Sequence, residues 1–473
     1  MTMPVMNIVF LLVFLCALFA IGIYFGRNNR SVSDYLLGGK SLHIGVSALT
    51  IAATMYGGGM LVGRTSYAYD TGVMMFLYGL SPLLTLGMAM LMCSKMKNFT
   101  SYTTVTEFLD ERYHSRFLRV TCSILSIISL VGVAGSNVTA LVSSITAMGF
   151  DNPIPWAVFF MAVIIILTTI GGIKAVAYTD AFQLIVIFIG VPTAMIFCLR
   201  QNGGFGQVLN ELQTVSDTLP QDYLTAVTPL NMITLLWLVL PNLLNRAISQ
   251  DIFQRMFSMK SRKEANIACG IAAVLVTILS MPPVVIGMIA RLRLPEMAEA
   301  GDSSSALAQV MLLYLPDWMF GLLFAAIIAA ILSTSDSLLT GAASHFANDV
   351  VEVLFTKQLE TNREKKLLLA TRIFTLAAGF FAVLYSLYSP GIINGMVYAI
   401  TLYTSGAFVP IFFGVMWKGA TRRGAIAGLI AGLLAAVAGF MGVEVGSVPG
   451  EIFSSLVGAV VLFLVSILDP QKQ

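Results

Sequence analysis

Thirteen stretches of about twenty mostly apolar residues follow one another along the chain, and little else lies between them. A helix needs about 20 such residues to cross the hydrocarbon core of a bilayer. The runs are continuous, whereas barrel strands would alternate apolar and polar residues over about ten positions. We therefore expect an all-α polytopic membrane protein with about 13 transmembrane helices. The predicted spans are 5–26, 43–69, 73–95, 117–146, 153–172, 176–200, 229–250, 264–290, 317–344, 366–388, 391–415, 423–441 and 450–468.

The composition excludes several other classes of protein. Of the 473 residues, 57% are hydrophobic and only 11% are charged, whereas a soluble domain carries roughly 25% charged residues. Most of the surface is thus expected to meet the lipid bilayer. The formal net charge of +3 is small, so nucleic acid is not expected as a partner. The five cysteines lie in apolar stretches without a CxxC pair, which argues against a disulfide framework or a zinc site.

Lysine and arginine predict the orientation of the chain. With the N-terminus outside, 22 of the 27 basic residues fall in cytoplasmic connections or in the C-terminal tail. Cytoplasmic loops carry such an excess, so we expect the N-terminus outside and the C-terminus in the cytoplasm. Residues 5–26 follow no basic segment and are interpreted as a retained helix rather than a signal peptide. A plasma membrane of the bacterial inner-membrane type is the expected location.

The function must lie inside the helical bundle, because no connection is long enough to form a soluble domain. The longest are 201–228 and 291–316, both predicted outside. A channel, a transporter and an intramembrane enzyme are the classes left. An enzyme would need a nucleophile with its base, or a metal site, and the sequence has no HExxH, no GxSxG and no paired carboxylates. An enzyme is therefore not expected.

Three consecutive glycines stand in the middle of the second predicted span, at Gly57, Gly58 and Gly59. Each weakens a helix by up to about 1 kcal/mol relative to alanine. Small residues can serve close helix packing, but a run of three beside Thr54 and Tyr56 favours an unwound stretch. Discontinuous helices of this kind form substrate and ion sites in many transporters.

The ninth predicted span holds four hydroxyl groups and a carboxylate in five consecutive positions, 333–337. Oxygen ligands of these kinds are those that hard cations prefer. Ser333, Asp336 and Ser337 share one helix face. The hydroxyls could instead bond back to the helix carbonyls, but an ionisable residue such as Asp336 inside a membrane indicates a functional site.

Further candidates are more isolated. Asp180 lies one turn into the sixth span, where it could either serve a site or pair with Lys174 near the membrane surface. Polar and aromatic residues of the third, fourth and seventh spans could contact a solute or serve structure alone. They are Tyr78, Ser136, Asn137, Trp237 and Asn242. Arg246 is the one arginine expected near a central cavity, and its orientation is left open.

Six motifs in order resemble the sodium:solute symporter family over roughly residues 5–468. They are GGKSL at 38–42, TVTEFLDER at 104–112, GGIKAVAYTDAFQ at 171–183, Gln254-Arg255, LSTSDSLL at 332–339 and the segment from Met416 to Gly424. The resemblance implies a LeuT-like 5+5 inverted-repeat core in a single transmembrane transporter domain. Residues 43–200 would form the first repeat and 229–415 the second, with an extra helix at 5–26 and two more at 423–468.

The resemblance also implies a function and its ion sites. The function would be sodium-coupled symport of a small organic solute into the cell by alternating access; the alternatives are a passive channel or facilitator, or a proton-coupled transporter of the same fold. The main Na⁺ site would use the carbonyls of Ala53, Tyr56 and Ala330 with the hydroxyls of Ser333 and Thr334. A second would use Asp180, Ser333 and Ser337, with Asp336 where some members have serine. Gly57, Gly58 and Gly59 would join the polar and aromatic candidates in binding the solute. Neither the solute nor the oligomeric state is predicted.

Overall fold

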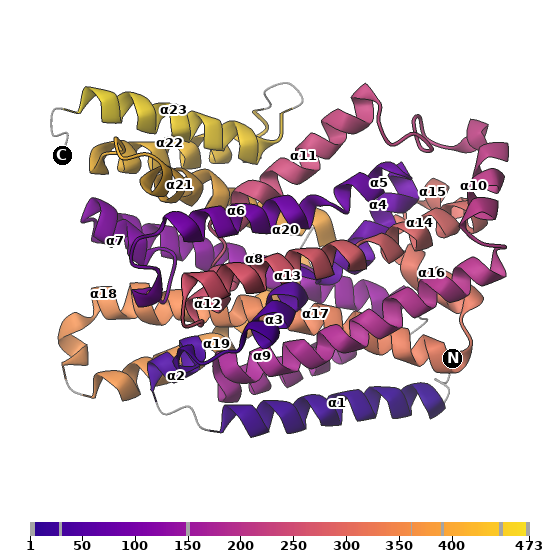
Figure 1. Cartoon of the computed structure of the whole chain (residues 1–473), viewed down its shortest axis with the longest axis horizontal. Helices are drawn as coiled ribbons and strands as arrows, with labels where there is room; N and C mark the ends of the chain where they lie inside the picture. The colour runs from indigo at the N-terminus through magenta and orange to yellow at the C-terminus, as the bar shows by residue number, and fades with distance from the viewer. Residues whose placement is uncertain are drawn as a thin grey trace.

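The computed structural model describes residues 5–27, 31–147, 152–360, 362–388, 392–443 and 448–469, and within them the chain forms helices and no strand. The helices run side by side near the long axis of the molecule (Figure 1). The helix α1 (Val5–Gly26) lies at one edge of the bundle, and α22 (Arg422–Phe440) and α23 (Gly450–Leu468) lie at the other. The first residue of α1 and the last residue of α23 lie at opposite ends of the long axis, as an odd number of spans requires.

Ten helices of the described chain are long and apolar enough to cross a membrane, or up to twelve when two bent helix pairs are included. The difference from the predicted thirteen lies in α9 (Ile154–Gln201), which has 48 residues and counts there as one span. A straight helix of that length would measure about 72 Å, more than twice the hydrocarbon core of a bilayer. The backbone of Gly172 interrupts α9 with φ 59° and ψ −171°.

The chain reverses direction at Gly172. Leu167 and Thr179 both approach Gly22 of α1, with side-chain atoms 2.9 Å and 3.8 Å from the position that a Cβ would take there. In a straight helix these two residues would lie about 18 Å apart along the axis. The two halves of α9 therefore correspond to the predicted spans 153–172 and 176–200, and counting them separately restores thirteen spans.

Several other spans are interrupted. The second consists of α3 (Ile44–Met55), a π-helix (Gly59–Gly63) and α4 (Arg64–Thr71). The seventh consists of α11 (Pro229–Arg246) and α12 (Gln250–Phe257), bent by 44°. The remaining helices that build the spans are α5 (Met74–Tyr78), α6 (Ser81–Lys95), α8 (Arg116–Ala147), α13 (Arg262–Leu279), α14 (Met281–Arg293), α17 (Asp317–His345), α19 (Arg363–Tyr388), α20 (Ile392–Tyr403) and α21 (Val409–Met416).

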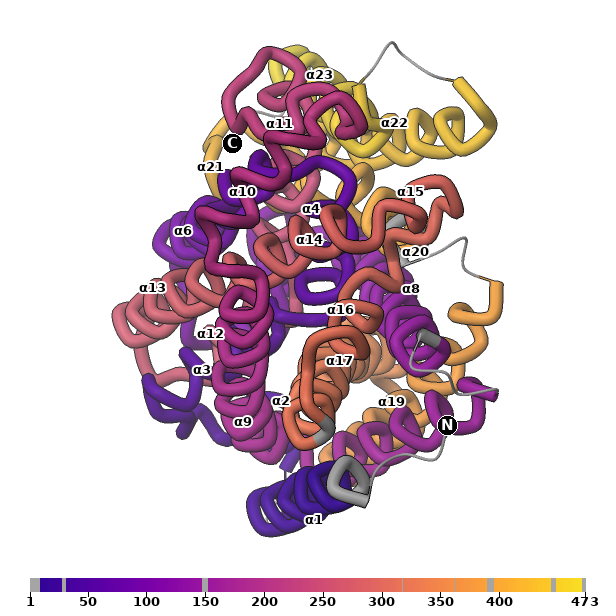
Figure 2. The backbone as a smooth tube through the Cα atoms, turned by 90° about the vertical axis from the view of Figure 1, so that its right-hand side faces the viewer, coloured from indigo at the N-terminus to yellow at the C-terminus, as the bar shows by residue number. Residues whose placement is uncertain are grey.

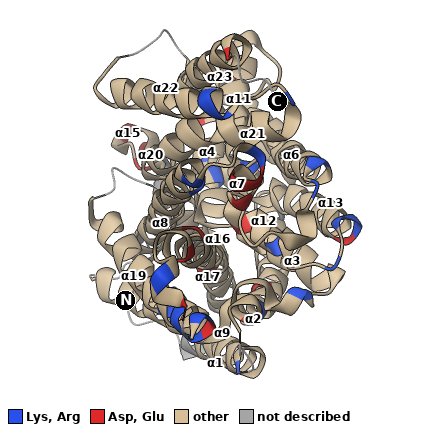
Figure 3. Cartoon of the chain, turned by 90° about the vertical axis from the view of Figure 1, so that its left-hand side faces the viewer, with Lys and Arg blue, Asp and Glu red and all other residues tan. Residues whose placement is uncertain are grey.

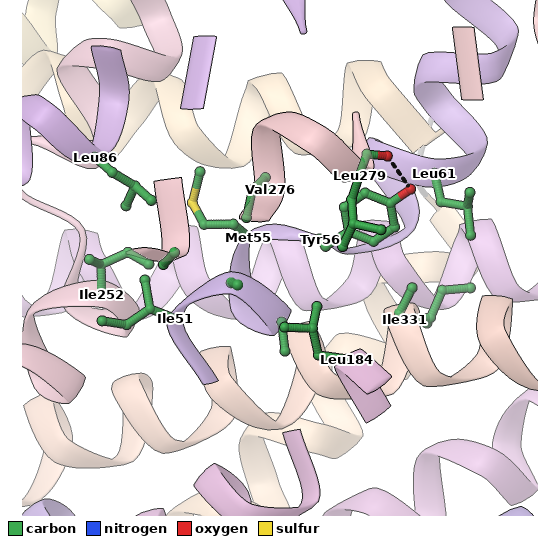
Figure 4. Close-up of a cluster of buried hydrophobic side chains, with 14 of the residues drawn as sticks. Ile51, Met55, Tyr56, Leu61, Leu86, Leu184, Ile252, Val276, Leu279 and Ile331 are labelled. Carbon is green, nitrogen blue, oxygen red and sulfur yellow. Dashed lines mark hydrogen bonds between the residues drawn. The ribbon is translucent and has the colours of Figure 1, made fainter. Parts of the chain in front are cut away.

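A hydrogen bond ties the broken second span to the eighth. Pro283 has no N–H and cannot donate to the carbonyl four residues earlier, which is that of Leu279. The hydroxyl of Tyr56 donates to this carbonyl instead, at 2.9 Å (Figure 4). The contact lies within a cluster of buried apolar side chains, with Leu61 beside it. The break in the second span is thus held at a fixed place in the core.

The two ends of the bundle differ. The connecting helices α10 (Phe205–Thr214) and α15 (Glu296–Ala300) lie at one end (Figure 2), where Arg293 pairs with Glu211 at 2.7 Å. Lysine and arginine gather at the other end, around α7 (Glu107–Tyr113), α13 and α19 (Figure 3). The two long connections predicted outside therefore lie together, opposite this basic end.

Candidate cation and solute site

The helix of the second span is interrupted beside the run of glycines. The helix α3 ends at Met55, and Tyr56 follows with the non-helical angles φ −100° and ψ 63°. A Cβ added to Gly57 would lie 2.6 Å from Oγ1 of Thr334 and 3.0 Å from its Cβ. Only glycine allows the chain to approach α17 so closely. The predicted unwinding is therefore present, and close packing accounts for two of the three glycines as well, since a Cβ at Gly58 would lie 2.8 Å from that of Ala140.

Oxygen atoms of α3 and α17 converge beside this break. The hydroxyl oxygen of Ser333 lies 3.3 Å from the carbonyl oxygen of Ala53 and 3.2 Å from that of Ala330. The hydroxyl oxygen of Thr334 lies 3.4 Å from the carbonyl oxygen of Ala53 and 3.2 Å from that of Ala330. The last carbonyls of a helix lack partners within it, and the helix dipole favours a cation there. The end of α3 is therefore suited to bind a cation.

The spacing of these atoms also fits a cation. Hydroxyl hydrogen bonds usually join oxygens about 2.7–2.8 Å apart, so contacts of 3.2–3.4 Å are long. Two oxygen ligands that each lie about 2.4 Å from a hard cation, with an oxygen–cation–oxygen angle of about 90°, would be about 3.4 Å apart. Four predicted ligands, from Ala53, Ala330, Ser333 and Thr334, meet at this place. Tyr56, the fifth, follows the last residue of α3.

A second buried polar cluster lies near the first, on α9, α12 and α17. Asp180, Asp336 and Arg255 are at most 1% exposed. The guanidinium of Arg255 lies 3.2 Å from Oδ2 of Asp180 and also donates to the hydroxyls of Thr50 and Ser337. Asp180 thus pairs with Arg255. The alternative prediction, that Asp180 pairs with Lys174 near the membrane surface, is wrong.

Two carboxylates come together in this cluster, although the sequence shows none in pairs. The carboxyl groups of Asp180 and Asp336 interact with each other, and Ser337 contacts both, at 3.5 Å and 3.3 Å. Oδ1 of Asp180 and Oδ2 of Asp336 are buried and have no hydrogen-bond partner in the described part of the chain. These two oxygens are of the kind that a small, hard cation prefers as ligands.

A cavity of about 90 Å³ adjoins the break in the second span. It brings together five of the eight predicted solute-binding residues, Gly57, Gly59, Tyr78, Asn137 and Asn242. Thr334 also lines it, so one side chain faces both the oxygen cluster and the cavity.

The other three predicted residues do not line this cavity. A Cβ at Gly58 would meet Ala140, and the hydroxyl of Ser136 donates to the carbonyl of Gly132 on its own helix. Trp237 is half-buried elsewhere on α11. Nδ2 of Asn242 donates to the hydroxyl of Tyr78 at 3.3 Å, which joins two lining residues.

The sequence alone left the orientation of Arg246 open and did not identify Arg64. Arg246 lines the cavity and pairs with Asp251 at 2.7 Å. Arg64, at the start of α4, is 1% exposed and lies over the ring of Tyr78. Its signal was present in the sequence, since a charged residue inside an apolar span indicates function.

Comparisons with known proteins show the family of this chain and its fold. Residues 35–432 match the model of the Sodium:solute symporter family. The chain is 26% identical to the sodium/proline symporter of Escherichia coli (strain K12), over 96% of this chain and 91% of that protein. It is also 26% identical to the high-affinity choline transporter 1 of Drosophila melanogaster, over 82% of this chain and 63% of that protein. The solved structure of a substrate-bound, outward-open Na⁺-coupled sialic acid symporter has a TM-score of 0.83 at 20% identity, covering 99% of this chain and 98% of that one.

Proposed function

The chain belongs to the sodium:solute symporter family, and on that premise we propose that a sodium ion bridges α3 and α17 beside a solute cavity. The protein is a multi-pass membrane transporter with a LeuT-like fold, and it couples the movement of a small solute to sodium. The proposal concerns where this chain holds the ion and the solute, and how one affects the other.

The main sodium site uses the carbonyls of Ala53, Tyr56 and Ala330 and the hydroxyls of Ser333 and Thr334. The convergence of four of these residues at 3.2–3.4 Å supports it. All the ligands are neutral, so the charge of the ion is balanced only by dipoles and by the end of α3. Such a site would bind sodium moderately and release it readily.

A second cation is held by Asp180, Asp336 and Ser337. Two buried carboxyl oxygens without a hydrogen-bond partner in the described residues, beside the hydroxyl of Ser337, support this assignment. Because Arg255 already contacts Asp180 and Ser337, we expect the ion to use Oδ1 of Asp180 and Oδ2 of Asp336, which have no other partner in the described residues.

The single observation that carries the proposal is that Thr334 lies both at the main sodium site and at the solute cavity. Its hydroxyl is a ligand in the main site, and its side chain lines the solute cavity. Sodium would fix Thr334 and the adjacent glycine break, and so shape the cavity for the solute. Each ligand then binds better when the other is present, as coupling requires.

The transport cycle follows from two repeats that rock against each other around the site. We assign residues 43–200 to the first repeat and 229–415 to the second. We propose that the basic end of the bundle faces the cytoplasm, with the N-terminus outside and the C-terminus inside; the gathering of lysine and arginine at that end supports this orientation. A bacterial-type inner membrane is the proposed location. A fluorescent protein fused to the C-terminus tests the orientation, and we expect it to fluoresce because it would lie in the cytoplasm.

Equilibrium binding of radioactive sodium to the purified protein tests the proposal. Thr334→Ala is expected to weaken sodium binding at least tenfold, and Asp180→Asn less. Ser335→Ala is the matched control, because Ser335 is buried one position away but donates to Ile331 of its own helix at 2.7 Å. Equal weakening in both alanine variants, or none in Thr334→Ala, would remove the main site from this place.

A further inference from the structure

Arg64 is the most unusual charged residue in the bundle. Its side chain is 1% exposed, and Nε and Nη1 have no hydrogen-bond partner among the described residues. Its Nη2 lies 3.1 Å from the sulfur of Met60, which is a weak acceptor. The guanidinium lies 4.7 Å from the centre of the Tyr78 ring. A contact with a ring and a sulfur stabilises a guanidinium far less than a carboxylate does.

Arg255, the other arginine that is buried in the described chain, has an acidic partner, since it pairs with Asp180. The half-buried Arg246 and Arg119 pair with Asp251 and Asp349. No such ion pair includes Arg64 within the described residues. An arginine keeps its charge in proteins, so it cannot escape the penalty of burial by losing a proton. Its counter-charge is expected from outside the described chain.

The position of Arg64 indicates where that counter-charge enters. Both residues that contact the guanidinium, Met60 and Tyr78, line the solute cavity. The arginine that itself lines the cavity, Arg246, is already paired with Asp251. Arg64 is therefore a positive charge without an acidic partner in the described residues, and it lies directly behind two residues that line the cavity.

We infer that Arg64 recognises an anionic group, a carboxylate, on the transported solute. This inference rests on the proposed function and specifies the solute class for the same cavity. A guanidinium presents two parallel N–H donors that match a carboxylate. The solute is then an organic acid or a zwitterion, such as an amino acid, and not a quaternary amine or a neutral polyol. Sodium and the carboxylate would move together as complementary charges.

A thermal-shift experiment tests the inference with a panel of candidate solutes. The purified full-length protein in saturating sodium chloride is melted with small carboxylates, each beside its own amide, for example L-proline and L-prolinamide. Choline and myo-inositol represent cations and neutral polyols. We expect at least one carboxylate to raise the melting temperature and its amide to have no effect. No stabilising carboxylate, or stabilisation by amides, choline or myo-inositol alone, would overturn the inference.

Variants of Arg64 then test its role. Arg64→Gln is expected to weaken binding of the stabilising carboxylate at least tenfold, and Arg64→Lys to retain part of it. Arg200→Gln, an exposed change, is the matched control. Arg64→Gln should also melt at or above the wild-type temperature without solute, because it removes a buried charge that lacks a partner. Unchanged carboxylate binding, or a large loss of stability without solute, would overturn the inference.

The same samples separate this inference from the proposed function. Sodium, compared with potassium, should still raise the melting temperature of Arg64→Gln, which also reports that the variant is folded. If sodium stabilises the wild type but no carboxylate does, only the inference about Arg64 fails. If sodium does not stabilise the wild type at all, the proposed function fails first.

Discussion

The hydroxyl oxygen of Thr334 on α17 lies 3.4 Å from the carbonyl oxygen of Ala53 on α3. These residues are 281 positions apart in the chain, and each lies in a different predicted repeat. The contact forms at the end of α3, where the Ala53 carbonyl accepts from the N–H of Tyr56 at 3.1 Å and has a second lone pair free for another ligand. A cation bound here would hold two helices at fixed distance, and its release would let them separate.

Gly57→Ala is expected to weaken sodium binding and to lower the stability of the protein. The added Cβ would lie 2.6 Å from Oγ1 of Thr334, so either α17 or the break must move. Overpacking of this kind typically destabilises by about 1–3 kcal/mol. Thermal melting and sodium binding measure the two effects.

Gly87→Ala is the control for this change, because a Cβ at Gly87 in α6 would meet nothing within 4 Å. Alanine stabilises a helix relative to glycine by up to about 1 kcal/mol. We expect Gly87→Ala to melt at or slightly above the wild-type temperature with normal sodium binding. Equal melting temperatures and equal sodium binding in the two variants would mean that the close approach of Gly57 to Thr334 is not required for either property.

Tyr56→Phe is expected to lower stability while leaving the sodium response intact. The change removes the hydroxyl that donates to Leu279, and Pro283 cannot replace it. A buried acceptor left without a donor typically costs about 1–3 kcal/mol. The proposed sodium ligand is the main-chain carbonyl of residue 56, which the substitution keeps.

Melting in sodium and in potassium measures both parts of the Tyr56 prediction. Tyr24→Phe is the control, since Tyr24 is 59% exposed. A Tyr56→Phe variant that loses the sodium response together with its stability would indicate that the hydroxyl positions the ion site. A variant as stable as wild type would show that the Leu279 carbonyl does not need this donor.

Glu107 gives a prediction about pH. It lies on α7, outside the spans, where burial and the nearby carboxylate of Asp349 raise its pKa above the ordinary 4.5. Asn348 and Arg119 contact it and act in the opposite direction without cancelling the rise. Lys40 is also close enough to interact. The folded protein thus holds this proton more tightly than the unfolded chain does.

The sign of the effect follows from proton binding. Above about pH 4.5 the folded state binds more protons at Glu107 than the unfolded state, so stability falls as pH rises through the raised pKa. We expect the melting temperature of wild type, measured relative to Glu107→Gln, to fall over this window and then to level off. The exposed Glu360→Gln should follow wild type at every pH. Melting temperatures of Glu107→Gln and of wild type that change in parallel with pH would contradict the prediction.

The sequence predicted the features that depend on local composition. Apolar runs gave the number of spans, and the glycines at 57–59 gave the break in the second. The hydroxyl-rich face at Ser333 and Thr334 does lie against α3. Even the reversal at Gly172 falls at the predicted end of a span, because a glycine can adopt the positive φ that the turn requires.

Features that depend on distant partners could not be predicted in this way. The sequence could not show that Asp180 pairs with Arg255, 75 residues away, rather than with the neighbouring Lys174. Nor could it show that Arg64 lacks an acidic partner among the described residues, since that depends on all the helices packed around it. Pairing of charges is a property of the assembled bundle, and hydropathy along the chain does not contain it.

The melting temperature of the purified protein in sodium chloride and in potassium chloride, at equal ionic strength, tests the central claim most directly. An ion that binds only the folded state must stabilise it by mass action. The account predicts that sodium raises the melting temperature of wild type and of Ser335→Ala, and that Thr334→Ala loses the rise. Equal melting of wild type in the two salts, or an undiminished sodium response in Thr334→Ala, would contradict a sodium ion between α3 and α17.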